Sequence, residues 1–262
     1  SVQIRKLEAR LGHPLFDRRG RQLHLTEAGR IALDHADAIF SAGEELVGTL
    51  RNTGGARRVL RVGALATLSR NFQMAFLKPL LGRGDVELVL RSGSTSELLQ
   101  SLKELSLDVV LVNQAPSRDA LTRFVAHRLA EQPVSLIGTR ARLGKRKKED
   151  LSRRLQSHPI ILPTTDSSVK IGFDALVNRL GIRPQIVAEV EDMAMMRLLA
   201  RQDIGLAVLP PIVVKDELES GALLEADRLP GITETFYAVT MNRKFPNPIL
   251  KPLLARNLLD LT

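Results

Sequence analysis

The sequence predicts an α/β protein with two lobes, preceded by a short helix-and-hairpin segment and one long helix. Three observations support this prediction. The first 26 residues combine a basic amphipathic helix with an arginine-rich turn, and an uninterrupted helical pattern follows. From residue 56 onward, β-rich runs alternate with helix-like segments in two successive sets. Such alternation is typical of sheets covered by helices.

The composition is that of a globular protein with a basic surface. The chain has 262 residues, with 38 Lys and Arg against 29 Asp and Glu, and a formal net charge of +9. No apolar stretch approaches the roughly 18 residues that a membrane span needs, so no membrane partner is expected. Excess positive charge favours a polyanion partner. Because aromatic residues make up only 3%, base stacking by a single-strand reader is disfavoured and double-stranded DNA is expected.

The sequence offers no catalytic or metal-binding signature. It contains no cysteine, which excludes disulfides and thiolate chemistry and fits a cytoplasmic location. It also lacks the G-x-S-x-G, P-loop and G-x-G-x-x-G patterns, and its five histidines are scattered without metal-ligand spacing. We therefore predict no enzymatic activity, no cofactor and no metal site.

Residues 1–26 have the pattern of a winged DNA reader. Apolar positions recur at helical spacing at Val2, Ile4, Leu7 and Leu11. The following "PLFDRRGRQLHLT" predicts a two-stranded hairpin whose tip carries Arg18, Arg19 and Arg21. In such a reader the helix enters the major groove, and guanidinium groups reach phosphates or a narrow minor groove. The alternative is a solvated helix and a surface turn.

Residues 27–55 predict one long helix, with Thr26 as its N-cap and the "TGG" sequence as its end. Small and apolar side chains repeat at alternating spacings of four and three, which is typical of a helix that pairs with another helix. We expect this linker helix to form a dimer interface; the alternative is packing on its own domain. The interface positions are Ala32, Ala36, Ile39, Gly43, Leu46 and Leu50.

Two sets of alternating segments predict the two lobes. Strands are expected at 59–64, 86–93 and 107–113, then at 134–139, 159–163, 184–190 and 204–210, with a late strand at 234–242. If the final helix returns to the first lobe, the chain crosses between the lobes twice, as in a hinged ligand trap. The predicted boundaries are 56–133 and 243–262 for the first lobe, and 134–242 for the second. The basic run 140–154 is read as a solvated loop and helix.

Four loops at the carboxyl ends of these strands offer polar side chains for a ligand. Ligands in α/β lobes bind at that edge, near free helix N-termini. The candidates are Thr67, Ser69, Ser94, Thr95, Thr164, Thr165 and Glu191. Each taken singly is better explained as a helix cap, but together they predict a cleft for a small polar ligand. A cation held by Glu189, Glu191, Asp192 and Asp166 is an alternative, although surface solvation explains these carboxylates more simply.

The N-terminal residues resemble those of LysR-type transcriptional regulators. The resemblance rests on Ser1, Gln3, Ile4, Leu7, Glu8, Leu11 and Gly12, then on "PLFDR" at 14–18 and "LTEAG" at 25–29. It implies a winged helix-turn-helix with two further helices before Ser1, so that residues 1–26 are part of a DNA-binding domain. It also implies that Ser1, Val2, Gln3 and Arg5 face DNA from the recognition helix, and that Arg18, Arg19 and Arg21 belong to the wing.

The two-lobed region is similar to the periplasmic-binding-protein-like effector domain of the same family. This implies a homo-oligomer that responds to a small effector, contacts RNA polymerase and binds the effector near Thr67, Ser94, Thr95 and Thr164. The segments "HADAIFSAGEELVGTL", "EVEDMAMM" and "ETFYAVTMNRKFPNP" are similar to regulators of sodium/proton antiporter genes, which implies sodium or a linked pH change as the signal. The alternative function is a two-lobed solute-binding protein for transport.

Overall fold

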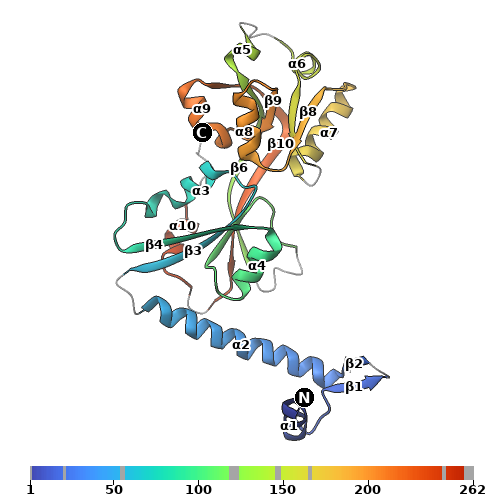
Figure 1. The fold of residues 1–262 in the computed structure, drawn as a ribbon, viewed down its shortest axis with the longest axis vertical. Helices are drawn as coiled ribbons and strands as arrows, with labels where there is room; N and C mark the ends of the chain where they lie inside the picture. The colour runs from blue at the N-terminus through green and yellow to red at the C-terminus, as the bar shows by residue number, and fades with distance from the viewer. Residues whose placement is uncertain are drawn as a thin grey trace. The chain divides into compact units, whose positions relative to one another are not determined.

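The computed structural model of residues 1–262 describes all of them except 1, 20–21, 54–56, 118–123, 145–148, 165–166, 244–245 and 257–262. The chain divides into two compact units, Ser1–Gly55 and Ala56–Thr262 (Figure 1). Each unit is described separately.

The first unit contains the predicted helix, hairpin and long helix. Its elements are α1 (Val2–Leu11), β1 (Phe16–Arg19), β2 (Gln22–Leu25) and α2 (Glu27–Thr53). Helix α1 ends at Gly12, which has a φ of 72° and donates its N–H to the carbonyl of Glu8. A glycine adopts this left-handed conformation without the steric cost of a side chain. Strands β1 and β2 are antiparallel, with Phe16 opposite Leu25.

In the second unit, the described residues form one mixed sheet of eight strands in the order β4-β3-β5-β10-β6-β9-β7-β8. Three of the predicted strands of each lobe are parallel to one another, whereas the predicted strand 134–139 runs antiparallel to its neighbour at 206–209. The first lobe has β3 (Arg58–Leu65), β4 (Val86–Gly93) and β5 (Val109–Val112), and the second has β7 (Ile160–Pro163), β8 (Ile186–Val190) and β9 (Leu206–Leu209). Parallel neighbours require crossover segments, which are mostly helices here and cover the sheet.

The helices of this unit follow the predicted alternation. They are α3 (Arg70–Leu77), η1 (Lys78–Leu80), α4 (Thr95–Lys103), α5 (Arg140–Leu143), α6 (Leu151–Ser157), α7 (Ser168–Leu180), α8 (Met193–Arg201), η3 (Pro211–Val214), α9 (Lys215–Ser220) and α10 (Leu250–Leu254). Helix α10 buries Leu250 and Leu253 in the same core as Leu60 of the first lobe. None of the helices within the described ranges is long and apolar enough to cross a membrane.

Two long antiparallel strands connect the lobes, β6 (Phe124–Thr139) and β10 (Leu223–Met241). The sequence predicted only the ends of these strands and assigned 234–242 to the second lobe. That assignment is wrong, because Tyr237 of β10 pairs with Val112 of β5 in the first lobe. The pairing of β10 with β6 is irregular between Arg228 and Thr233, where Gly231 has a φ of 77°. A Pro-Gly pair that usually marks a turn here lies in a bulge within a continuous strand.

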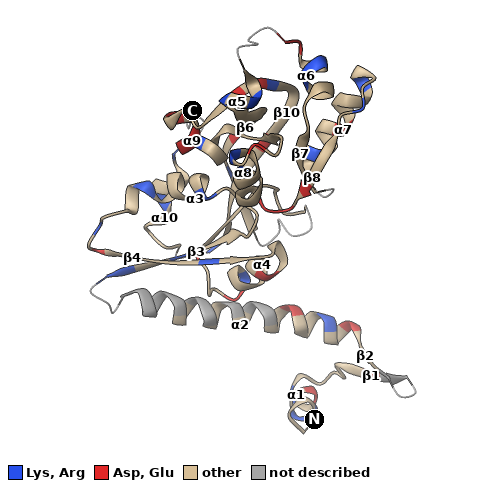
Figure 2. Cartoon of the chain, turned by 45° about the horizontal axis from the view of Figure 1, so that its top comes forward, with Lys and Arg blue, Asp and Glu red and all other residues tan. Residues whose placement is uncertain are grey.

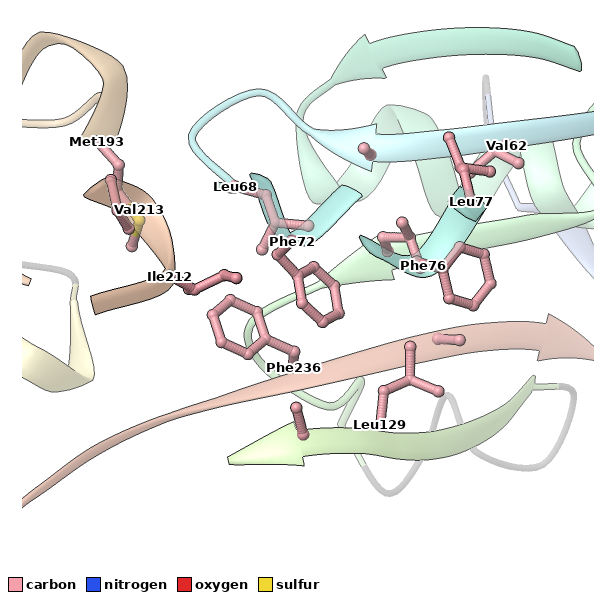
Figure 3. Packing of buried hydrophobic residues seen from close by; sticks show 14 of the residues in the cluster. Val62, Leu68, Phe72, Phe76, Leu77, Leu129, Met193, Ile212, Val213 and Phe236 are labelled. Atoms are coloured by element: carbon pink, nitrogen blue, oxygen red, sulfur yellow. The ribbon is translucent and has the colours of Figure 1, made fainter. Parts of the chain in front are cut away.

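A single buried cluster joins side chains from both lobes. The rings of Phe72 on α3 and Phe236 on β10 stack with centroids 4.2 Å apart and an interplanar angle of 17°. Figure 3 shows Ile212 of η3 beside these rings, and Met193 of α8 lies in the same cluster. Burial of this shared apolar surface stabilises the lobes as one compact unit.

Candidate functional site

The hairpin of the first unit is held to α1 by the side chain of Glu8. Oε1 of Glu8 accepts hydrogen bonds from the backbone N–H groups of Leu15, at 2.8 Å, and Phe16, at 3.2 Å. Leu15 is buried. A charged acceptor on two backbone donors is stronger than a neutral one, so Glu8 sets the position of β1 relative to α1.

The hairpin is also held to α2, through Thr26 and Gly29. Thr26 donates its hydroxyl to the carbonyl of Pro14 (2.7 Å) and accepts the N–H of Gly29 (2.9 Å), as the predicted N-cap should. A Cβ on Gly29 would lie 2.0 Å from the carbonyl oxygen of Leu15, so only glycine fits there. The "LTEAG" segment therefore has a structural role in fixing the hairpin on α2.

The outer face of α1 presents the side chains expected to face DNA. Val2 is 69% exposed, and Gln3 and Arg5 are exposed. Ser1 and Arg21 lie outside the described residues. Arg18 and Arg19 lie on β1, but their side chains are outside the described part. Val2, Gln3 and Arg5 are thus accessible on the surface of this unit, and their contact with DNA stays a prediction.

The expected dimer positions lie along α2. Ala32 and Ala36 are half-buried, Ile39 is 70% exposed, Leu46 is 59% exposed and Gly43 is exposed. The side chain of Leu50 is outside the described part. Sequence reasoning missed Phe40, which is 73% exposed, and Val47, which is 48% exposed. They directly follow Ile39 and Leu46, so a wider apolar stripe would have included them.

An apolar groove of about 710 Å³ lies between α1 and α2. It is lined by Leu7, Leu11, Leu15, Ile31, Ala32, Ala36 and Ile39, among others. The groove shares three residues with the expected dimer positions. An apolar surface of this kind is typical of a site that packs against another protein segment or subunit.

A cavity of about 830 Å³ opens at the carboxyl ends of the strands of the second unit. Five segments line it, each following a different strand: 65–67 after β3, 93–95 after β4, 113–117 after β5, 163–164 and 167 after β7, and 191 and 193 after β8. The first three segments belong to the first lobe and the last two to the second. The cavity thus lies between the lobes, at the edge where ligands of α/β folds bind.

Five of the candidate ligand-binding residues meet in this cavity: Thr67, Ser94, Thr95, Thr164 and Glu191. Ser69 does not reach it. Its side chain is buried and accepts the N–H of Phe72 as the N-cap of α3, so the capping alternative holds for this residue. Thr165 lies outside the described residues.

Helix N-termini from both lobes begin at this edge of the sheet. Ser94 and Glu97 form a capping box at α4, Ser167 caps α7, and Asp192 caps α8. Hydrogen bonds from Ser94 to the Glu97 carboxylate lower the pKa of Glu97. The positive ends of three helix dipoles, with hydroxyl groups beside them, favour a polar ligand that carries acceptor oxygens.

The acidic segment at the end of β8 is shown in red in Figure 2, and the contacts of its described side chains do not favour a cation site. Glu189 lies 3.7 Å from Nζ of Lys170, and Asp192 is engaged as a cap. Asp166 lies outside the described residues. In the part of the chain that the structure describes, no three acidic or histidine side chains are grouped as metal ligands.

Sequence reasoning missed the loop 113–117, which follows β5 at the same edge as the four loops that were chosen. Nδ2 of Asn113 donates a hydrogen bond to Oε1 of Glu234, at 3.1 Å. Glu234 is only 1% exposed, and burial raises its pKa to about 7 despite that hydrogen bond. Applying the strand-end rule to every strand would have found Asn113, but Glu234 is far away in sequence.

The basic run 140–154 is not simply a solvated surface. Arg154 is buried and forms an ion pair with Asp227, at 2.7 Å, and Arg142 forms one with Asp203, at 2.9 Å. These ion pairs connect α5 with Asp203 and α6 with Asp227 of β10 in the second lobe. Residues 145–148 lie outside the described part.

Comparison with known proteins extends over both units. The family described as "LysR substrate binding domain" matches residues 53–258, and "Bacterial regulatory helix-turn-helix protein, lysR family" matches residues 1–30. The HTH-type transcriptional regulator CbbR of Rhodospirillum rubrum is 27% identical, over 97% of this chain and 84% of that protein. The transcriptional activator protein NhaR of Escherichia coli is 23% identical, over 95% of this chain and 82% of that protein.

Solved structures share the fold. The LysR family regulator CbnR superposes with a TM-score of 0.58 and 22% identity, covering 97% of this chain and 86% of CbnR. Vibrio fischeri DarR, solved in complex with DNA, superposes with a TM-score of 0.59 and 18% identity, covering 97% of this chain and 87% of DarR.

Proposed function

Because the chain belongs to the LysR family of DNA-binding transcriptional regulators, we propose that the cavity between the two lobes of its effector domain binds the signal that controls transcription. The observation that carries this proposal is the convergence of Thr67, Ser94, Thr95, Thr164 and Glu191 on one cavity from two lobes. A ligand that contacts both lobes stabilises the arrangement in which those contacts are made, and so shifts the population of lobe arrangements.

In this proposal the unit 1–55 reads DNA and pairs subunits. Helix α1 contacts base edges through Val2, Gln3 and Arg5, and the hairpin contacts phosphates or the minor groove through Arg18, Arg19 and Arg21. The apolar stripe of α2 pairs with α2 of a second subunit, which gives a homo-oligomer. A change in lobe arrangement then alters the angle between paired DNA readers, the bend of the DNA and the access of RNA polymerase in the cytoplasm.

The chemical class of the signal is a small polar molecule or ion. The helix N-termini at the cavity support a ligand with acceptor oxygens. The resemblance to regulators of sodium/proton antiporter genes supports sodium or a linked pH change, acting on an activator. The described acidic side chains are not grouped as metal ligands, so they add no support for sodium. The buried carboxyl of Glu234 supports a response to pH.

The DNA-reading part is tested by a gel shift of the full-length protein on the intergenic DNA beside its own gene. Arg19→Ala with Arg21→Ala should weaken the shift and reduce its salt dependence, because two phosphate contacts are lost. Arg83→Ala, an exposed arginine of the second unit, is the control. A shift indifferent to the hairpin changes contradicts the role of the wing.

Sodium binding in the cavity is tested by calorimetric titration of the full-length protein with sodium chloride and, separately, with potassium chloride. A sodium-specific signal that is lost in Thr67→Val and Thr164→Val identifies sodium as the ligand. Identical behaviour of the two salts eliminates sodium. Thr233→Val, outside the cavity lining, is the matched control.

A further inference from the structure

A buried carboxyl group lies where β10 passes from one lobe to the other. Glu234 pairs with Gln132 of β6, directly after the irregular register between Arg228 and Thr233. One carboxyl oxygen accepts the hydrogen bond from Asn113, which lines the cavity. Among the described residues, the other oxygen, Oε2, is buried and has no hydrogen-bond partner. Glu234 therefore connects the crossing strand, the first lobe and the cavity.

None of the ion pairs formed by the described residues includes Glu234. Arg118 and Arg123, which precede β6, lie outside the described residues. On β6, Arg128 pairs with Glu131, which also accepts the hydroxyl of Thr233. His127 on the same strand bonds to Thr240, and burial lowers its pKa, which disfavours the charged imidazolium.

In the described part of the chain, the charged side chains on the helices that contact β10 also form no ion pair with Glu234. Lys170 of α7 lies 2.7 Å from Asp174 and 3.7 Å from Glu189, and is thus already paired. Glu191 of the cavity lining adds a further negative group. The remaining charged side chains on these helices are Glu97 and Lys103 on α4, Arg140 and Arg142 on α5, Asp174 and Arg179 on α7, and Lys215, Asp216, Glu217 and Glu219 on α9.

The ionised and the protonated carboxyl of Glu234 differ in the free-energy cost of being buried without a hydrogen-bond donor. An ionised, buried Oε2 without a donor costs free energy, which water or a new donor relieves only if the site opens. A protonated carboxyl carries no net charge and is tolerated in the closed arrangement. Since Asn113 connects the carboxyl to the cavity wall, opening at Glu234 also moves the cavity lining.

We propose that Glu234 is a proton-binding site that sets the arrangement of the two lobes around the effector cavity. With the proton bound, the lobes keep the arrangement of this structure; when the proton leaves, Asn113 shifts and water reaches the carboxylate from the cavity. The proton site and the lobe movement involve only residues of this chain and do not depend on the proposed function of the cavity. Their effect on transcription rests on that proposed function.

The test measures the distance between the lobes as a function of pH. Because the chain has no cysteine, Ser96→Cys on α4 and Asn178→Cys on α7 give one spin label on each lobe. Labelled full-length subunits are diluted with unlabelled ones, and distances are recorded from pH 5 to pH 9. We expect a shift in the distance distribution with a midpoint near pH 7, which is absent in Glu234→Gln and retained in Glu225→Gln on the same strand.

A pH-independent distance in the parent protein, or an unchanged transition in Glu234→Gln, overturns the proposal. A second measurement does not depend on the variant: ¹³C NMR of the parent labelled in its glutamate carboxyls should show one group titrating near pH 7. If all glutamates titrate below about pH 5.5, the proton site is absent. A pH-dependent distance without any pH-dependent change in the gel shift supports the proton site and contradicts the proposed control of DNA binding by the cavity.

Discussion

The carboxylate of Glu8 on α1 accepts the backbone N–H of Leu15, seven positions further along the chain, at 2.8 Å. The same oxygen accepts the N–H of Phe16. The position of the hairpin relative to α1, the proposed DNA-reading helix, thus depends on Glu8, a side chain that makes no contact with DNA in the proposed mode of binding.

Glu8→Ala should therefore weaken DNA binding without removing a DNA contact. Loss of a charged acceptor for two backbone donors costs about 1–3 kcal/mol. In the full-length protein we expect a weaker gel shift and lower urea stability of the N-terminal unit, with partial recovery in Glu8→Gln, which keeps an oxygen acceptor. Asp34→Ala on the exposed face of α2 is the control, and an equal loss there would show that the effect is one of charge alone.

Ser94→Ala should destabilise the cavity wall. Ser94 caps α4 and its N–H and hydroxyl bind the Glu97 carboxylate, so the substitution removes one side of a capping box. The expected cost is about 1 kcal/mol. Ser96→Ala, two residues into the same helix, should have almost no effect in urea unfolding of the full-length protein. Equal losses for the two variants would contradict the capping role.

Phe236→Ala should destabilise the whole effector domain. Phe236 is fully buried, stacks on Phe72 and belongs to the cluster that the two lobes share. Large-to-small changes at such sites cost about 3–5 kcal/mol. Thermal unfolding of the second unit should shift accordingly, whereas Met74→Ala, at a 51% exposed position of α3, should leave it almost unchanged. A mild effect of Phe236→Ala would show that the lobes are stabilised elsewhere.

The stability of the effector domain should depend on pH through Glu234. Its pKa is about 7 in the folded protein, against an ordinary 4.5, so folding favours the protonated form. The contribution is fully present below about pH 4.5 and is lost as the pH rises towards 7. Urea unfolding of the parent and Glu234→Gln should show the variant gaining about 2–3 kcal/mol relative to the parent between pH 5 and pH 8. Parallel pH profiles of the two proteins would contradict this.

The sequence predicted the elements of the first unit more completely than those of the second. Local patterns place α1, the hairpin and α2 correctly, because each is specified by short-range signals such as Gly12, Thr26 and helical spacing. The parallel strands of each lobe were found as short apolar runs. The long strands β6 and β10 were predicted only in part. The Pro-Gly pair at 230–231 is typical of a turn, and the chain stays extended there because β10 pairs with β6 on both sides of it.

The candidate effector site shows the same division. The strand-end rule predicted Thr67, Ser94, Thr95, Thr164 and Glu191, since the edge at which parallel strands end follows from their direction alone. It failed at Ser69, where a hydroxyl serves the backbone of its own helix. Local sequence does not distinguish a capping hydroxyl from one that faces a cavity.

The family, the order of the elements and the polar loops of the cleft could be predicted from the sequence, because they depend on residue types at fixed short spacings. The partner of Glu8, the buried pairs of Arg142 and Arg154, and the site of Glu234 beside Asn113 were decided only by the tertiary structure. Burial and pairing across 121 residues depend on how distant strands lie together, and the pKa of Glu234 follows from that burial.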